Sequence, residues 1–174
     1  DESAHLDLDD KSLMALYQQT PQVCAEAAMT LIDRMLHFDV SVQKFTNVFS
    51  KCCDNRICYY LFQCIIYNRA YDKVTMEKYR RAICIIQKKY NPTDDVYKES
   101  LRFREFLDLL ITDNTAYIRD CSQRKDDVLL MAVSLNQNTP MDIIEHLITI
   151  KDIKNAKIIR TNAERLKKRV AKLF

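Results

Sequence analysis

The chain of 174 residues contains no glycine. Glycine supplies the positive φ angles of tight turns and lets a backbone come close to a phosphate or an oxyanion. Walker loops, dinucleotide-binding fingerprints, kinase Gly-rich loops and the G-x-S-x-G nucleophile elbow all need glycine at fixed positions, so this chain can form none of them. The hairpin turns of barrels and sandwiches also depend on glycine. We therefore predict an all-α protein.

Long apolar runs are scarce as well. The longest uncharged apolar stretches, such as residues 57–67 and 128–135, fall well short of the roughly 18 residues that span a bilayer. We expect no transmembrane helix and no membrane partner. The N-terminus is acidic and lacks the apolar core of a signal peptide. It also begins without Met, from which we expect an excised fragment or a processed chain.

The seven cysteines are an odd number, and most of them lie among apolar residues at helical spacing. A secreted disulfide scaffold usually carries an even number, whereas a buried free thiol packs as a small hydrophobic group. We therefore expect free thiols and a cytoplasmic or nuclear location.

Pro, Asn, Asp and Thr residues punctuate the helices in place of glycine. Thr20-Pro21 and Thr139-Pro140 each put a capping hydroxyl before a proline, which is favoured at the first position of a helix. Asp54 and Thr75 are further predicted N-terminal caps, and either Asp39 or Ser41 is expected to cap the 42–53 helix. Apolar side chains recur every three or four positions between these residues, as in amphipathic helices. The main expected helices are 21–38, 42–53, 55–71, 76–90, 96–111, 140–150 and 151–174, with a short helix at 12–19 and, at 114–123 and 126–135, two short helices or one interrupted helix.

The composition is that of a folded chain, with 48% hydrophobic and 29% charged residues. Short connections between helices favour antiparallel neighbours. We predict antiparallel helical hairpins stacked as a compact bundle or a short α-solenoid of about eight helices. Residues 1–11 are expected to form an acidic, partly disordered arm and residues 12–174 a single domain, with two lobes as the alternative. The predicted core residues of the two central helices are Leu61, Ile65, Ile83 and Ile86.

Side chains that could support catalysis or bind a metal are few. Cys52, Cys53, Cys58 and Cys64, with His37 nearby in the sequence, are the only cluster of metal-binding types. Their spacing differs from paired zinc knuckles, so we interpret them as thiols of the helix core. The acidic pairs Asp94-Asp95 and Asp126-Asp127 stand at predicted helix starts, where carboxylates cap. The histidines His5, His37 and His146 each have a structural explanation. We expect no enzyme, no metal and no cofactor.

Tyrosines are unusually concentrated, since seven of the nine fall between Tyr59 and Tyr97. Tyrosine is enriched at interfaces because its ring is apolar and its hydroxyl polar. Steps of seven and four residues place three of them on one edge of the predicted 55–71 helix, and basic residues flank them. The predicted partner-binding residues are Tyr60, Tyr67, Tyr71, Arg56 and Arg69, with Arg80 and Arg81 on the next helix.

Positive charge gathers at the C-terminus. From Lys151 onwards nine basic residues stand against two acidic ones, a net +7 in a chain whose total is +3. An apolar stripe of Ile159, Ala163, Leu166, Val170 and Leu173 predicts that the opposite face of this helix is polar. The charge is then either a solvated face or a contact with an acidic partner or nucleic acid. The candidate residues are Arg160, Arg165, Lys167, Lys168, Arg169 and Lys172.

These patterns favour a non-enzymatic helical interaction module of a larger intracellular protein, an adaptor or scaffold domain. It would hold a peptide or helix of a partner in a tyrosine-rich groove. The first alternative is an RNA- or DNA-associated domain whose C-terminal helix contacts phosphates. A viral or regulatory helical bundle that occupies a groove of a host partner is a further alternative. A secreted helical bundle fits least, because of the odd cysteine.

Overall fold

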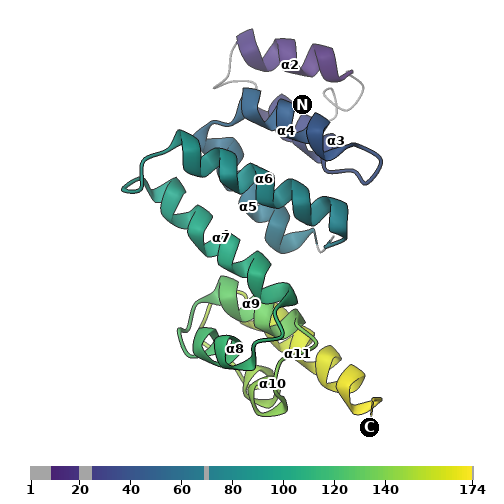
Figure 1. Ribbon diagram of the computed structural model, residues 1–174, viewed down its shortest axis with the longest axis vertical. Coiled ribbons are helices and arrows are strands. Elements are labelled where there is room, and N and C mark those ends of the chain that lie inside the picture. The colour runs from purple at the N-terminus through teal and green to yellow at the C-terminus, as the bar shows by residue number, and fades with distance from the viewer. Residues whose placement is uncertain (1–8, 20–24, 69–70, 174) are drawn as a thin grey trace. The chain divides into compact units, whose positions relative to one another are not determined.

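The computed structural model describes residues 9–19, 25–68 and 71–173. Within these residues 76% are helical and no strand is present, which confirms the all-α prediction. Ten helices, labelled α2 to α11 in Figure 1, account for this content. None of the helices described is both long and apolar enough to cross a membrane. The chain divides into two compact units, with the boundary between Ser100 and Leu101.

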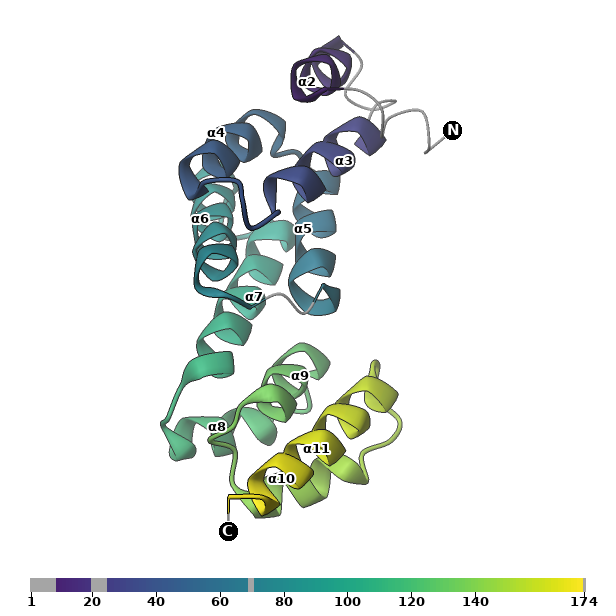
Figure 2. The same cartoon turned by 90° about the vertical axis from the view of Figure 1, so that its right-hand side faces the viewer.

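The first unit is a stack of helix pairs. Helix α3 contacts α2, α4 and α5, and α4 also contacts α6, so the α3–α4 pair lies on the α5–α6 pair (Figure 2). This packing of one pair on the next is the predicted stacking of hairpins. The helices of this unit are α2 (Asp10–Gln19), α3 (Ala25–Met35), α4 (Val42–Cys52), α5 (Asn55–Tyr67), α6 (Lys73–Lys89) and the first part of α7 (Asp95–Ile111).

The core of the first unit lies where these pairs meet. The rings of Phe45 and Phe49 on α4 stack with centroids 5.8 Å apart, and both are fully buried. Burial of such apolar side chains removes them from water and supplies most of the stability of the packing between these helices. The four predicted core residues are at most 1% exposed, which confirms them: Leu61, Ile65, Ile83 and Ile86.

Local capping explains where the helices of the first unit begin. Ser41 and Asp54 accept backbone N–H groups at the starts of α4 and α5, as predicted. The predicted cap Thr75 is wrong, because Asp72 caps α6 and Thr75 lies buried inside the helix with its hydroxyl donating to Asp72. Helix α5 ends at Tyr67, earlier than the predicted residue 71. The Thr20-Pro21 cap lies outside the described residues.

A buried lysine ties α6 to the end of α3. Lys78 is 0% exposed, and its ammonium donates to the carbonyls of Met35 and His37, each at 2.8 Å. These carbonyls lie at and just beyond the C-terminus of α3, where helical N–H partners run out and the dipole favours a cation. Lys78 therefore supplies a cap for α3 from a helix far away in the sequence.

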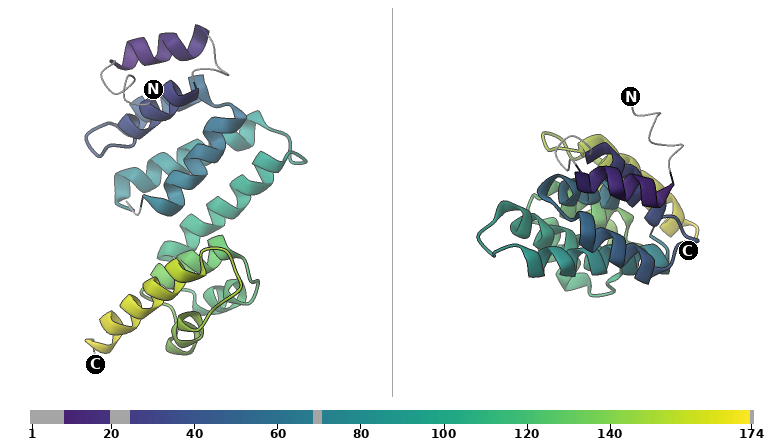
Figure 3. Two further views of the ribbon diagram at one scale, coloured as in Figure 1. Left: turned by 180° about the vertical axis from the view of Figure 1, so that it is seen from behind. Right: turned by 90° about the horizontal axis from the view of Figure 1, so that it is seen from above.

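The second unit is built around α9, which is buried along nearly its whole length. Helix α9 contacts α8, α10 and α11, and α10 also packs on α11 (Figure 3). Asp126 caps α9 through the amides of Val128 and Leu129, as the acidic pair predicted. Its carboxylate also binds the guanidinium of Arg102 at 2.8 and 2.9 Å. The unit contains the rest of α7, α8 (Thr115–Ser122), α9 (Asp127–Leu135), α10 (Met141–Ile148) and α11 (Ala156–Ala171).

Two predictions for this unit are wrong. Thr139 does not cap α10, because its buried hydroxyl donates to the carbonyl of Val133 and Pro140 itself occupies the cap position. Helix α11 begins at Ala156 rather than at residue 151. Asp152 and Asn155 before it have φ angles of 60° and 62°, in the left-handed region that interrupts a right-handed helix. Glycine usually occupies such positions, and in this chain Asp152 and Asn155 take the left-handed conformation instead.

Candidate functional site

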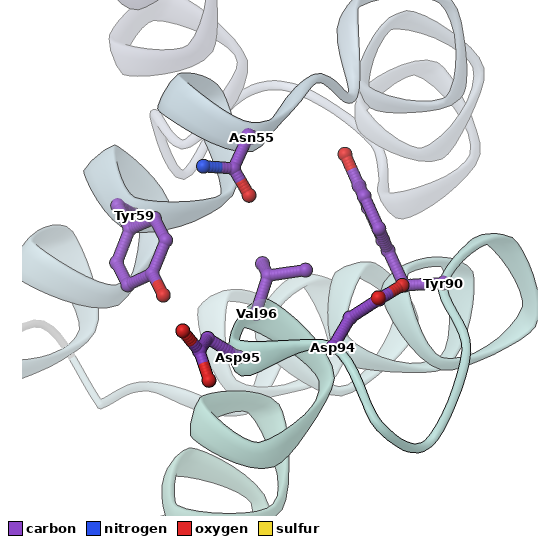
Figure 4. Close-up of a pocket in the computed structure, with 6 residues that line it drawn as sticks. All are labelled: Asn55, Tyr59, Tyr90, Asp94, Asp95 and Val96. Atoms are coloured by element: carbon purple, nitrogen blue, oxygen red, sulfur yellow. The ribbon is translucent and has the colours of Figure 1, made fainter.

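Two adjoining cavities open on the first unit and share Asn55 and Tyr59 of α5. We call this region the α5 surface. The larger cavity, of about 380 Å³, is lined by side chains from α5, from the end of α6 and from the start of α7 (Figure 4). The smaller one, of about 240 Å³, lies between α5 and Met29 of α3. The lining residues of the larger cavity are Asn55, Tyr59, Tyr90, Asp94, Asp95 and Val96.

Two tyrosines form opposite walls of the larger cavity. Figure 4 shows the Tyr59 and Tyr90 rings on either side of Val96, with the hydroxyl of Tyr59 directed toward Asp95. Tyr59 is 36% exposed, and its ring meets the edge of Phe62 at a centroid distance of 5.7 Å. An edge-to-face contact of this kind holds a ring in one orientation. Tyr59 is therefore a fixed aromatic surface that remains open to solvent.

Two carboxylates give the same cavity a negative charge. Asp94 and Asp95 stand at the start of α7, and the carboxylate of Asp94 accepts the backbone N–H of Asn91 at 2.9 Å. Burial, together with the nearby charges of Glu99 and Asp95, raises the pKa of Tyr59. Two carboxylates exceed the half positive charge of a helix N-terminus. The cavity therefore combines an aromatic wall with net negative charge.

The smaller cavity is more apolar in its lining. Met29 of α3 faces Arg56, Tyr60 and Gln63 of α5 across it. The hydroxyl of Tyr60 contacts both carboxylate oxygens of Asp33 at 2.6 Å. Burial and this carboxylate raise the pKa of Tyr60. Tyr60 thus contributes a fixed ring to the cavity, while its hydroxyl joins α5 to α3.

The predicted partner-binding residues are only partly brought together. Arg56 and Tyr60 line the smaller cavity, whereas Tyr67 is 47% exposed at the end of α5 and lines neither cavity. Tyr71 is not on α5, so its predicted place on one helix edge with Tyr60 is wrong. Its hydroxyl donates to the Ile65 carbonyl at 2.8 Å and so caps the end of α5.

Arg69 lies outside the described residues. Arg81, on α6, pairs with Glu77 at 2.9 Å. Sequence reasoning missed Tyr59, Tyr90, Asp94 and Asp95 as members of one site. Little in the sequence indicated this group. The two tyrosines were only two of the seven between Tyr59 and Tyr97, and capping of a helix was a sufficient explanation for the two acids.

The four cysteines of the predicted cluster are buried thiols in the helix core. Cys52, Cys58 and Cys64 are buried on α4 and α5, and Cys53 is buried at the end of α4. His37 is exposed on the turn after α3. Across the described part of the chain, no three His, Cys, Asp or Glu side chains are grouped so that they could hold a metal ion.

Two of these thiols are in contact, with the sulfur atoms of Cys53 and Cys58 3.4 Å apart. The hydrogen bond from Cys58, together with the Lys89 ammonium, lowers the pKa of Cys53 in spite of burial. The same sulfur contact, together with burial, raises the pKa of Cys58. Cys53 is therefore the more acidic thiol of the pair.

The basic residues of the C-terminal helix fall into two groups. Arg160 donates to the carbonyl of Ile150 at 2.8 Å, and Lys167 lies 3.7 Å from Glu145. Both residues therefore make contacts within the second unit. Ile159, Ala163 and Leu166 are buried as predicted, Val170 is half-buried, and Leu173 is 80% exposed, which corrects its assignment to the core stripe. The basic side chains exposed on this helix or just after it are Lys157, Arg165, Lys167, Lys168, Arg169 and Lys172, and of these Lys167 lies near Glu145.

The second unit also has a cavity, of about 350 Å³, between the end of α8 and α10. Arg119 and Asp142 line it and pair with each other at 2.6 Å, and His146 completes the wall. The paired charges satisfy one another. His5, the third histidine, lies outside the described residues.

Comparison of the chain with protein-family models, with curated proteins and with solved structures gave no match.

Proposed function

We propose that the first unit is a non-enzymatic interaction module that binds a peptide segment of a partner protein on the α5 surface. The segment carries a basic side chain, Lys or Arg, next to an apolar one. The observation that carries this proposal is the shared position of Tyr59, which lines both cavities and lies beside Asp95. One ring can then contact two neighbouring side chains of the same peptide.

Charge and aromatic character favour a basic side chain in the larger cavity. A guanidinium or ammonium group over a tyrosine ring gains about 0.5–1 kcal/mol at an exposed site. Asp95 is exposed at the rim and supplies an opposite charge. Tyr90 already has the ammonium of Lys89 5.5 Å from its ring centroid, so the open ring for a partner cation is that of Tyr59.

The smaller cavity suits an apolar side chain. Met29 adapts to irregular shapes because its side chain is unbranched and polarizable. The Tyr60 ring is held by the contact of its hydroxyl with Asp33 and offers a rigid wall. A rigid aromatic wall costs little conformational entropy on binding, which is why tyrosine is common at binding hot spots.

Selection of short random peptides on the immobilised 174-residue chain tests this proposal. We expect the selected peptides to share a Lys or Arg beside an apolar residue. Tyr59→Ala should weaken their binding at least about tenfold, and Asp95→Asn about two- to fivefold, with the loss reduced at high salt. Asp113→Asn, at an exposed acid of the second unit, is the matched charge control. Acidic consensus peptides, or peptides that bind the Tyr59→Ala chain equally well, would refute the proposal.

A second candidate function rests on the exposed basic side chains of α11. Lys168 and Arg169 lie three and four residues after Arg165, and Lys172 lies four and three residues after them, so the four side chains share one face. A basic stripe of this spacing suits the phosphates of RNA or DNA. Its test is the salt dependence of nucleic-acid binding, described below.

A further inference from the structure

Cys53 and Cys58 are the two thiols in direct contact, and they lie on either side of a short connection between capped helices. Cys53 ends α4, and Cys58 lies in the first turns of α5. Their sulfur atoms are 3.4 Å apart, and the residues are 2% and 0% exposed. Asp54 between them caps α5 through the amide of Ile57 and accepts the hydroxyl of Tyr17 at 2.9 Å. The connection is therefore held in place, and so are the two sulfur atoms.

The neighbouring cysteines point to other partners. The thiol of Cys52 lies 3.3 Å from the carbonyl of Val48, within α4. The thiol of Cys64 lies 3.9 Å from a carboxylate oxygen of Asp33. Cys84 is exposed on α6. The thiol of Cys121 lies 3.7 Å from a carboxylate oxygen of Glu105. Among the cysteines that the structure describes, the contact between sulfur atoms is therefore specific to Cys53 and Cys58.

A cation and a hydroxyl adjoin this pair. The ammonium of Lys89 donates to the backbone carbonyl of Cys53, and the hydroxyl of Tyr90 is hydrogen-bonded to the thiol of Cys58. A nearby ammonium stabilises a thiolate, which is the reactive form of cysteine. Lys89 therefore favours the thiolate of Cys53, and the sulfur of Cys58 lies next to it.

We propose that Cys53 and Cys58 are a peroxide-sensitive dithiol that closes reversibly to an intramolecular disulfide. The oxidant is hydrogen peroxide, which is small enough for a buried pair, whereas a bulky disulfide such as oxidised glutathione would need Cys53 to be exposed. This proposal does not rest on the proposed peptide binding, although Tyr90 belongs to both sites.

The chemistry proceeds in two steps. The Cys53 thiolate attacks one peroxide oxygen, the O–O bond breaks, and Cys53 becomes a sulfenic acid while hydroxide leaves and takes a proton. The Cys58 sulfur then attacks the Cys53 sulfur, the S–O bond breaks, and the Cys58 proton leaves with the hydroxide as water. Two thiols and one peroxide give one disulfide and two waters. The sulfur atoms must approach from 3.4 Å to about 2.05 Å, a closure of about 1.4 Å.

Peptide mapping of the folded 174-residue chain tests the proposal. The reduced chain is treated with hydrogen peroxide, alkylated and digested with trypsin, which cleaves after Arg56 between the two cysteines. We expect one cross-linked pair of peptides, lighter by two hydrogen atoms than the reduced peptides together and separated again by reductant. Cys52→Ser and Cys64→Ser should keep this product, whereas Cys53→Ser should abolish it.

Lys89→Met tests the role of the cation. It should slow disulfide formation several-fold, while Lys88→Met, at an exposed neighbour on the same helix, should leave the rate unchanged. Because each of the two tryptic peptides carries two cysteines, fragmentation of the wild-type product must show the alkyl groups on Cys52 and Cys64. That assignment decides the matter even if a cysteine variant fails to fold. Sulfinic acid on one cysteine without cross-linking, a disulfide between other cysteines, or no faster reaction than in the urea-unfolded chain would overturn the proposal.

Discussion

Replacement of Lys78 by methionine removes the ammonium that caps α3 and keeps most of the side-chain volume. Lys78 is 0% exposed and donates to two carbonyls at 2.8 Å. A hydrogen bond from a charged donor contributes about 1.5–3 kcal/mol. Burial opposes this gain, and it lowers the pKa of Lys78 while Asp72 partly restores it. We expect Lys78→Met to reduce the free energy of unfolding by about 2–4 kcal/mol.

Denaturant unfolding followed by circular dichroism gives this difference, and amide hydrogen exchange locates it. Protection should fall first at the last turn of α3. Lys88→Met, at an exposed position of the same helix, should change the free energy of unfolding by less than about 0.5 kcal/mol. A Lys78→Met chain as stable as the wild type would mean that the desolvation of the ammonium outweighs its hydrogen bonds, and the capping argument would fail.

Three further outcomes follow from the same structure. Burial tends to raise the pKa of Asp126, but hydrogen bonds from Arg102 and the α9 amides hold it below the usual value. The stability from Asp126 is therefore complete above about pH 4 and lost as the pH falls through that lowered pKa, and urea midpoints of Asp126→Asn should lack this acid dependence. Leu61→Ala, at a fully buried residue of α5, should cost about 2–5 kcal/mol in thermal or urea unfolding. If α11 binds nucleic acid, reversing Lys168 and Arg169 to Glu should flatten the slope of log K against log salt by roughly one unit per lost contact without unfolding the chain; an unchanged slope would exclude these contacts.

Helix starts could be predicted from sequence where the cap and its partner are neighbours along the chain. Ser41 and Asp54 accept an amide three residues on, and Asp126 accepts amides two and three residues on, so the type of side chain and its position before an apolar run suffice. The buried stripes of α5 and α6 were predictable for the same reason. Helical periodicity identifies the apolar face before any partner is known.

The wrong predictions of helix starts arise where a polar side chain forms a hydrogen bond with a partner other than the expected one, or where the backbone takes a left-handed conformation. Thr75 and Thr139 both precede apolar runs, but Asp72 is a better acceptor at the start of α6, and the Thr139 hydroxyl binds the carbonyl of Val133. Helix α11 begins late because Asp152 and Asn155 take left-handed conformations, which short polar residues tolerate without glycine. Such choices depend on tertiary packing and leave no periodic signal.

The candidate site was predictable in kind and only partly in position. The concentration of tyrosines indicated an aromatic surface, and Arg56 and Tyr60 do line one cavity. Helical steps alone grouped Tyr71 with them, although α5 ends before that residue. Tyr59 and the start of α7 line one cavity although they are far apart in the sequence, so periodicity within one helix could not reveal it.

Calorimetric titration of a selected peptide into three forms of the 174-residue chain tests the central proposal most directly. The forms are the wild type, Tyr59→Ala and Tyr67→Ala. Both substitutions remove an exposed tyrosine of α5, but only Tyr59 lines the two cavities. We expect Tyr59→Ala to raise Kd at least about tenfold, and Tyr67→Ala to leave Kd unchanged, with both variants melting like the wild type. Equal losses in the two variants, or a loss confined to Tyr67→Ala, would contradict peptide binding on the α5 surface.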